Sequence, residues 1–479
     1  MKQLVVGLGE SGLAMVRHAV RTGAPVAAYD SRPAQVSVLR ERYADVTAFG
    51  GDFKPEFLDG VSEIAISPGL SPHASPLKEI LAAANERDIN VVGELDLFAR
   101  AIAAIENYAP KVLAVTGTNG KTTVTALTQH LCTSVGVSAV AAGNISPSML
   151  DALCDALDND TLPAVWVLEL SSFQLQFARE FNPHAATVLN ISQDHLDWHA
   201  DMAEYVAAKA RIFGAQTVQV LNRDDACGFA RDDLQSVSFG VQKPVAAGEY
   251  GLWRDGAMDW LSVAGLVNEE EQRKKRGQAV VEKAIEVQRL MPADALKIRG
   301  RHNAMNALAA LALCRAIDLP LAKLLHGLRT YAGEPHRVQH IAHINGVDFY
   351  DDSKGTNVGA TLAAINGLGQ PIVLIAGGEG KGQDFAPLFD AVKAHVKRMD
   401  LIGKDALTMQ SALAATGVAI YLHDSLDAAT QAAAQASVAG DAVLLSPACA
   451  SLDMFKNYAH RAQVFVDAVQ AWSLEQGQI

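Results

Sequence analysis

The stretch Thr116-Gly117-Thr118-Asn119-Gly120-Lys121-Thr122-Thr123 specifies the architecture of the central part of the chain. It follows an apolar segment, residues 111–116, that predicts a buried strand, and it leads into a predicted helix. Backbone N–H groups of such a strand-to-helix loop bind phosphates, the lysine reaches the β- and γ-phosphates, and the threonine after it binds Mg²⁺. We therefore predict an α/β domain in which residues 117–123 bind ATP.

A second glycine motif, Gly7-x-Gly9-x-x-Gly12, opens the chain after a short apolar segment, residues 3–6. Asp30 ends the next predicted strand, residues 25–30, so the segment has the pattern of a dinucleotide-binding βαβ unit. The turn recognises a pyrophosphate, and a diphosphate other than NAD satisfies it equally. The motif also fits a tight turn without a ligand. An NAD-dependent oxidoreductase and a non-catalytic nucleotide sensor therefore remain alternatives.

Three successive strand-helix blocks follow one another along the 479 residues. They predict an α/β protein with three mostly parallel sheets. We place the domains at residues 1–100, 101–333 and 334–479. Residues 268–289 carry a charge run and few β-branched residues, which predicts an exposed helical insertion in the second domain.

Bulk composition excludes several classes of protein. The formal net charge of −13 argues against nucleic-acid binding and against an anionic membrane surface. The five cysteines are scattered and form no CxxC pair, which predicts neither a disulfide framework nor a zinc ribbon. No signal-peptide core and no apolar run of about 20 residues is present. We expect a cytoplasmic protein without membrane insertion.

Candidate metal-binding side chains follow in the second block. Glu169 ends an apolar segment, residues 165–168, and a carboxylate at a strand end binds Mg²⁺ directly or through water. His195, Asp197 and His199 would suit a zinc hydrolase, which is a further alternative. Lys209 falls on a predicted amphipathic helix, where the residues alone favour a solvated lysine.

Several motifs together resemble the Mur ligase family over nearly the whole chain. The compact loop GTNGKT is joined by Glu169-Leu170-Ser171-Ser172-Phe173-Gln174-Leu175 and by the run at residues 190–197. Segments 335–337, 351–357, 377–381 and 446–458 resemble the third domain of members that add D-glutamate. Gln339 and Tyr458 depart from that pattern, which has Glu and Phe there.

The resemblance implies an ATP-dependent ligase of peptidoglycan synthesis. It implies a Rossmann-like N-terminal domain for the UDP substrate, a central P-loop ATPase domain, and a Rossmann-like C-terminal domain for the amino acid. UDP-N-acetylmuramoyl-L-alanine and D-glutamate would be joined through an acyl phosphate by a monomer that uses ATP and two Mg²⁺ ions. A hinge near Glu334 is expected. A sister ligase that adds another amino acid remains an alternative.

The resemblance also implies roles for individual residues. Lys121, His195 and Lys209 would be catalytic, with Lys209 carbamylated, and the metals would be held by Thr122, Glu169, His195 and Lys209. The nucleotide would also contact Asn303, Arg337 and Asp352. The UDP substrate would contact Glu10, Ser11, Ser31, Arg32 and Asn144. The glutamate site would comprise Lys354, Thr356, Lys381, Ser451 and Tyr458.

Overall fold

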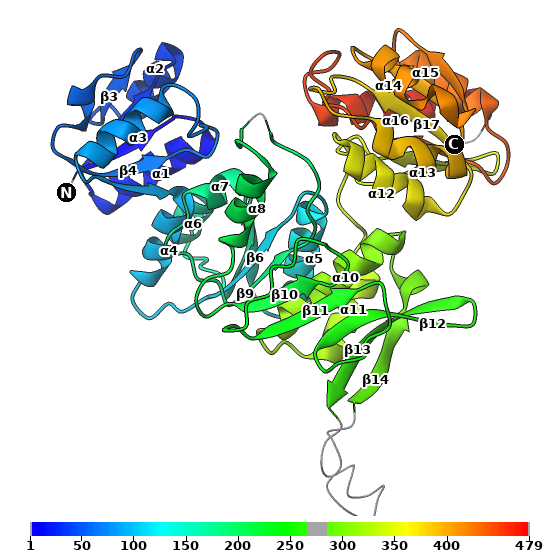
Figure 1. Ribbon diagram of the computed structural model, residues 1–479, viewed down its shortest axis with the longest axis horizontal. Coiled ribbons are helices and arrows are strands. Elements are labelled where there is room, and N and C mark those ends of the chain that lie inside the picture. The colour runs from blue at the N-terminus through cyan, green and yellow to red at the C-terminus, as the bar shows by residue number, and fades with distance from the viewer. Residues whose placement is uncertain (1, 197, 267–284, 478–479) are drawn as a thin grey trace, which may run out of the picture. The chain divides into compact units, whose positions relative to one another are not determined.

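The computed structural model describes residues 2–196, 198–266 and 285–477, and these residues form an α/β protein with three sheets (Figure 1). Each sheet is wholly or mostly parallel, so the predicted fold class is confirmed. The chain divides into two compact units. The first contains residues 1–295 and 305–330, and the second contains residues 296–304 and 331–479.

The first sheet carries the N-terminal glycine turn at its centre. Its five parallel strands are arranged as β3-β2-β1-β4-β5, where the strands are β1 (Lys2–Val6), β2 (Val26–Asp30), β3 (Thr47–Gly50), β4 (Val61–Ile66) and β5 (Asn90–Gly93). The main helices are α1 (Glu10–Thr22), α2 (Pro33–Arg42), α3 (Leu77–Glu86) and α4 (Glu94–Ala103). The strand order reverses between β1 and β4, which is where ligands bind in open α/β sheets. The turn after β1 lies at this point.

The second sheet is arranged around β6, the strand that leads into the phosphate loop. Its nine strands have the order β14-β13-β12-β11-β10-β9-β6-β8-β7. The strands are β6 (Lys111–Thr116), β7 (Ala139–Gly143), β8 (Val165–Glu169), β9 (Ala185–Val188), β10 (Val218–Asn222), β11 (Ser236–Gly240), β12 (Glu249–Asp255), β13 (Met258–Leu266) and β14 (Ile285–Pro292). The main helices are α5 (Lys121–Ser134), α6 (Met149–Asp158), α7 (Ser172–Gln176), α8 (Met202–Ala210), α10 (Arg301–Arg315) and α11 (Leu321–Thr330). β6 lies between β9 and β8, so its loop opens at the middle of the sheet.

The predicted helical insertion is wrong where the structure describes it. Residues 285–289 begin β14, which pairs antiparallel with β13 at the edge of the sheet. Apolar and polar residues alternate over residues 285–288, and this period of two suits a strand. The neighbouring charge run concealed that alternation. Residues 268–284 of the prediction lie outside the described residues.

Buried carboxylates join the first sheet's helices to the second sheet's segments within the first unit. Asp96 in α4 is fully buried and accepts hydrogen bonds from the backbone N–H groups of Arg179 and Glu180. Glu94 accepts one from the N–H of Leu150 at 3.0 Å. Because a buried carboxylate is costly unless it is hydrogen-bonded, these contacts fix α4 against the central segments.

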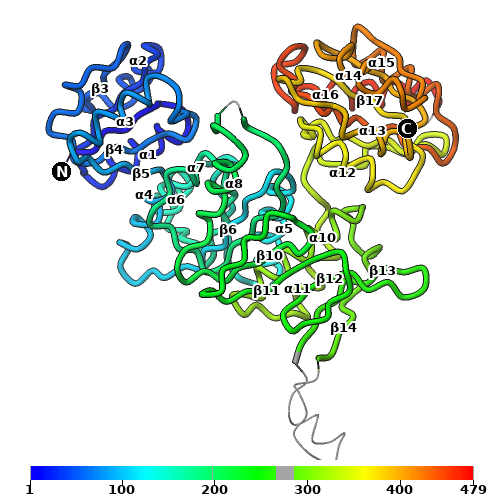
Figure 2. The backbone as a smooth tube through the Cα atoms, in the orientation of Figure 1, coloured from blue at the N-terminus to red at the C-terminus, as the bar shows by residue number. Residues whose placement is uncertain are grey.

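The third sheet belongs to the second unit, and the tube in Figure 2 shows the C-terminal helix packed against it. Its order is β15-β16-β20-β17-β18-β19, and β15 alone among these strands is antiparallel to its neighbour. The strands are β15 (Gln339–Ile344), β16 (Val347–Asp351), β17 (Ile372–Gly377), β18 (Val396–Ile402), β19 (Ala419–Leu422) and β20 (Ala442–Leu445). The helices are α12 (Val358–Leu368), α13 (Phe389–His395), α14 (Ala406–Leu413), α15 (Leu426–Ala436) and α16 (Tyr458–Glu475). Among the helices of residues 2–196, 198–266 and 285–477, none is both long and apolar enough to cross a membrane.

Candidate active site

The phosphate loop closes only because two of its residues are glycines. Gly117 and Gly120 have φ angles of 148° and 83°, a region that other residues rarely adopt. A Cβ atom on Gly120 would lie 2.8 Å from Asn306 Oδ1, and one on Gly117 would lie 3.0 Å from the Cβ of Leu189. The backbone of the loop therefore packs closely against Leu189 and Asn306, and the loop leads into the start of α5.

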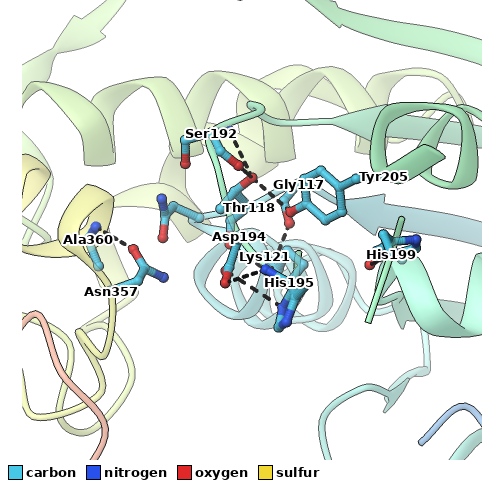
Figure 3. Close-up of polar contacts among 12 residues, drawn as sticks. Gly117, Thr118, Lys121, Ser192, Asp194, His195, His199, Tyr205, Asn357 and Ala360 are labelled. Carbon is cyan, nitrogen blue, oxygen red and sulfur yellow. Dashed lines mark hydrogen bonds and ion pairs between the residues drawn. The ribbon is translucent and has the colours of Figure 1, made fainter. Parts of the chain in front are cut away.

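The loop is held by side chains that follow β9 and by α8 (Figure 3). Asn190 accepts a hydrogen bond from Asn119 N at 2.9 Å and donates one to Asn119 O at 3.1 Å. The hydroxyls of Thr118 and Tyr205 are hydrogen-bonded at 2.9 Å, and Ser192 N donates to the same Thr118 oxygen. Sequence reasoning missed these supporting contacts, because only the folded chain brings residue 205 to residue 118.

Both predicted lysines reach the base of this loop. The amine of Lys121 donates to Gly117 O at 2.9 Å and to Thr118 O at 2.8 Å. The amine of Lys209 donates to the same Gly117 carbonyl at 3.0 Å and to the hydroxyl of Thr116 at 3.2 Å. The structure thus brings together two residues that are 88 positions apart, and it places both amines beside the phosphate loop.

Lys209 is buried, so the interpretation as a solvated lysine is wrong. Only 1% of the residue is exposed, and its amine lies 4.8 Å from the centre of the Tyr205 ring. Burial, together with the nearby charge of Lys121, holds the pKa of Lys209 well below its usual 10.5, against the opposing effects of Asp194 and Glu169. The neutral amine, which is the nucleophilic form of lysine, is therefore favoured.

Glu169 has the environment expected of a cation ligand. It is 2% exposed at the end of β8, and its Oε1 accepts a hydrogen bond from Asn144 at 2.7 Å. Its buried Oε2 has no hydrogen-bond partner among the described residues. A buried carboxylate oxygen without a partner is costly, and a bound Mg²⁺ ion would remove that cost. Together with the buried Thr122 in the first turn of α5, this donor set fits Mg²⁺.

The two histidines lie in different surroundings. His195 is partly exposed, has φ of 56°, and its Nε2 lies 3.6 Å from the carboxylate of Asp194. His199 is buried, and its Nε2 is hydrogen-bonded to Ser172 Oγ at 2.9 Å. Burial lowers the pKa of His199 to about 4, so its ring is neutral at physiological pH. His199 is thus tied to Ser172, whereas Asp197 lies outside the described residues.

The N-terminal glycine turn is fixed by Asp30. Its carboxylate accepts from Leu8 N at 2.7 Å and from the Arg32 guanidinium at 2.8 and 2.9 Å. Burial alone would raise the pKa of Asp30, but these hydrogen bonds hold it below its usual value. A Cβ atom on Gly12 would lie 1.8 Å from Gly7 O, so the helix approaches the turn as closely as the backbone allows. Asp30 therefore stabilises the turn after β1 by binding Leu8 and Arg32.

Four of the five residues predicted for the UDP substrate, all except Asn144, lie around the same turn. Glu10 begins α1 and accepts a hydrogen bond from Ser146 Oγ at 2.8 Å. Ser11 is half-buried next to it, and Ser31 is exposed after β2. The side chain of Arg32 is 62% exposed although it pairs with a buried carboxylate. These side chains leave polar groups available around the turn.

Three residues predicted to contact the nucleotide belong to the second unit, namely Asn303, Arg337 and Asp352. Asn303 donates to the backbone of Arg299 at 2.8 Å. Asp352 is buried and accepts from Ser446 Oγ at 2.7 Å, and burial raises its pKa to about 7.

The predicted glutamate residues lie in loops at one edge of the third sheet, except Tyr458, which is the first residue of α16. Their loops follow the carboxyl ends of β16, β17 and β20, which is where ligands bind in such sheets. The amine of Lys354 lies 5.5 Å from the Tyr458 ring centre. A bridge between Glu379 and Ala450 joins the loop of Lys381 to that of Ser451. Thr356 follows Lys354 in the first of these loops.

Sequence reasoning missed Arg461. This arginine is fully buried in α16 and donates to both oxygens of Ser353 and to the carbonyl of Cys449. It therefore ties together two loops of the predicted glutamate site. Its burial could have been predicted from its spacing. Arg461, Phe465 and Val469 follow one another at intervals of four residues, which places them on one face of a helix, and the other two are apolar. Cys449 is buried, and burial raises its pKa to about 12.

Models of three consecutive domains match the chain. Residues 1–93 match the Mur ligase MurD-like N-terminal domain, residues 115–314 match the Mur ligase middle domain, and residues 336–449 match the Mur ligase, glutamate ligase domain. Curated relatives include a protein of Paraburkholderia xenovorans, strain LB400, that is 54% identical over 99% of this chain and 97% of its own length. The chain therefore belongs to the Mur ligase family.

The names of the relatives are more specific. The protein of Paraburkholderia xenovorans is called UDP-N-acetylmuramoylalanine–D-glutamate ligase, as is one of Burkholderia mallei, strain SAVP1, with the same identity and coverage. Solved structures share the fold at lower identity. MurF from Acinetobacter baumannii matches with a TM-score of 0.58 at 16% identity, over 98% of this chain and 90% of that one. UDP-N-acetylmuramate-alanine ligase MurC from Thermotoga maritima matches with 0.54 at 20%, over 98% and 100%.

Substitution of Gly120 by alanine tests the loop geometry. The added Cβ would meet Asn306, whereas Gly136→Ala at a φ of 87° meets no atom within 4 Å and serves as the matched control. We expect Gly120→Ala to lose the rise in thermal midpoint that ATP gives, because binding to the native state stabilises it, and Gly136→Ala to keep that rise. Equal ATP-dependent shifts in the two variants would show that the loop does not bind ATP in this conformation.

Proposed function

We propose that this protein is an ATP-dependent ligase that adds D-glutamate to UDP-N-acetylmuramoyl-L-alanine. The observation that carries the proposal is that Lys121, buried Lys209 and Glu169 lie near one phosphate loop. The chain is also 54% identical to ligases of that name. Such an arrangement suits phosphoryl transfer, where positioning and charge stabilisation supply most of the rate.

Each sheet is given one task in this proposal. Residues 1–100 would hold the UDP substrate at the glycine turn, residues 101–333 would bind ATP, and residues 334–479 would bind glutamate. The three separate sheets and the three matched domain models support this division. The lysines Lys354 and Lys381 suit an amino acid with two carboxylates.

The reaction proceeds in two steps. A carboxylate oxygen of the UDP substrate attacks the γ-phosphorus of ATP, the bond to the β-phosphate oxygen breaks, and ADP leaves. The acyl phosphate is then attacked by the glutamate amine, and the tetrahedral intermediate expels phosphate and loses a proton to give the amide. The lysine of the loop stabilises the negative charge that develops on the transferring phosphoryl group.

Four residues would hold the metal ions. Thr122 and Glu169 would hold one Mg²⁺, and His195 with carbamylated Lys209 would hold the second. When bound, the ions spread the negative charge of the phosphates and of the attacking carboxylate. A carbamate forms when the neutral amine adds CO₂ and releases a proton, which converts the amine into an anionic oxygen ligand. The burial and lowered pKa of Lys209 support this assignment.

A panel of amino acids tests the specificity. Phosphate release is measured with ATP and UDP-N-acetylmuramoyl-L-alanine, and D-glutamate is expected to give the highest kcat/KM. Faster release with another amino acid would favour a sister ligase, and binding of NAD in place of the UDP substrate would favour an oxidoreductase.

Lys121→Ala should reduce turnover by roughly 100- to 1000-fold or more, because one preorganised positive charge is lost at the phosphoryl group. Phosphate release is measured at saturating substrates, and circular dichroism checks the fold. Near-normal release by a folded variant would remove Lys121 from the ATP site.

Lys209→Ala should lower activity by orders of magnitude, because a metal ligand would be lost. Wild-type activity should also fall when CO₂ is depleted and recover with bicarbonate, and intact mass spectrometry should detect one added CO₂ on Lys209. An active alanine variant together with an unmodified native side chain would contradict the carbamate.

Arg32→Ala should raise the KM for the UDP substrate and change the KM for ATP much less. Its side chain is exposed beside the glycine turn, remote from the reacting carboxylate, so its binding energy is shared by ground and transition states. A raised KM for ATP with an unchanged KM for the UDP substrate would place the UDP site elsewhere.

A further inference from the structure

The loop after β7, residues 144–148, contacts two of the predicted sites. At its start, Asn144 is hydrogen-bonded to Glu169, the predicted metal ligand. Two residues later, Ser146 donates to Glu10 beside the N-terminal glycine turn. The loop therefore links the carboxylate at the end of β8 with the turn after β1.

Glu169 is held by Asn144 at two points. The backbone N–H of Asn144 donates to Glu169 O at 2.8 Å, and its side-chain Nδ2 donates to Oε1 at 2.7 Å. The amide of Asn144 therefore presents its NH₂ group, and Oε1 of Glu169 is the acceptor. With Oε1 fixed, the orientation of the carboxylate plane is fixed as well. The remaining oxygen, Oε2, is the buried one without a hydrogen-bond partner among the described residues.

Gly143 makes this double contact possible. Its φ is 111°, and a Cβ atom at this position would lie 2.3 Å from Glu169 O. The backbone of the loop therefore rests directly on the end of β8, at a distance that only glycine permits. This close contact fixes the backbone of Asn144 relative to Glu169.

We propose that Asn144 is a positioning residue that orients Glu169 for Mg²⁺. It occupies Oε1 with a charge-assisted hydrogen bond and thereby leaves Oε2 as the oxygen for the ion. The sequence predicted that Asn144 binds the UDP substrate, and the structure gives its NH₂ group a different partner. The inference rests on the proposed function, since it concerns the metal that accompanies ATP.

The test compares Mn²⁺ binding to the full-length protein in the presence of ADP, measured by electron paramagnetic resonance. Loss of a residue that orients a metal ligand typically weakens metal binding 10- to 100-fold, so we expect a loss of about that size in Asn144→Ala and in Asn144→Leu, which keeps the side-chain volume. Asn159→Ala is the matched control, because its exposed amide donates to Asp155 O at 2.8 Å in α6, away from the site. The control should bind Mn²⁺ as the wild type does.

Kinetics separate positioning from a merely structural role. For the Asn144 variants we expect a raised Mg²⁺ requirement and recovery of most of kcat at high Mg²⁺, with an unchanged KM for glutamate. Unchanged Mn²⁺ affinity in either variant with a wild-type circular dichroism spectrum would overturn the proposal, and a raised KM for the UDP substrate alone would do the same. Absence of glutamate-dependent phosphate release in the wild type would contradict the proposed function instead, and the Mn²⁺ comparison would still decide the role of Asn144.

Discussion

The carbonyl of Gly117 accepts hydrogen bonds from two lysine amines, and the rest of the candidate site depends on this shared contact. Two ammonium groups at one oxygen repel each other, and one of them, Lys209, is buried. Burial and the charge of Lys121 therefore lower the pKa of Lys209 and favour its neutral form. The neutral amine is the form of lysine that adds CO₂, so this lowered pKa supports the carbamate that we propose at Lys209.

Parallel sheets explain how residues so far apart in the sequence meet. In the central sheet, β6 carries the loop and neighbouring β8 carries Glu169, and both strands end at the same edge. In the third sheet, the loops after β16, β17 and β20 gather the predicted glutamate residues in the same way. The first sheet places its glycine turn where the strand order reverses. Each predicted task therefore falls at the carboxyl edge of one sheet.

The fold class and the phosphate loop could be predicted from the sequence because they depend on local patterns. Apolar strands, glycines at turns and the Gly-Lys-Thr run act within a few residues. The burial of Lys209 could not be predicted in this way, since it depends on α8 packing behind the loop. The same applies to the hydrogen bonds of Arg461 and to the contact between Asn144 and Glu169. The strand that begins at residue 285 was missed although its pattern is local. The long charge run beside it indicated a helix, and the alternation of apolar and polar residues was too short to indicate a strand.

The central claim is that a substrate carboxylate is activated by transfer of the γ-phosphate, and the oxygen atoms record that transfer. When the carboxylate of UDP-N-acetylmuramoyl-L-alanine is labelled with ¹⁸O in both positions, one labelled oxygen becomes the bridge to phosphorus and stays there when the amide forms. Mass spectrometry of the released phosphate should therefore find one ¹⁸O atom for each amide made with D-glutamate. Amide formation with unlabelled phosphate would contradict an acyl phosphate and the account of the site built on it.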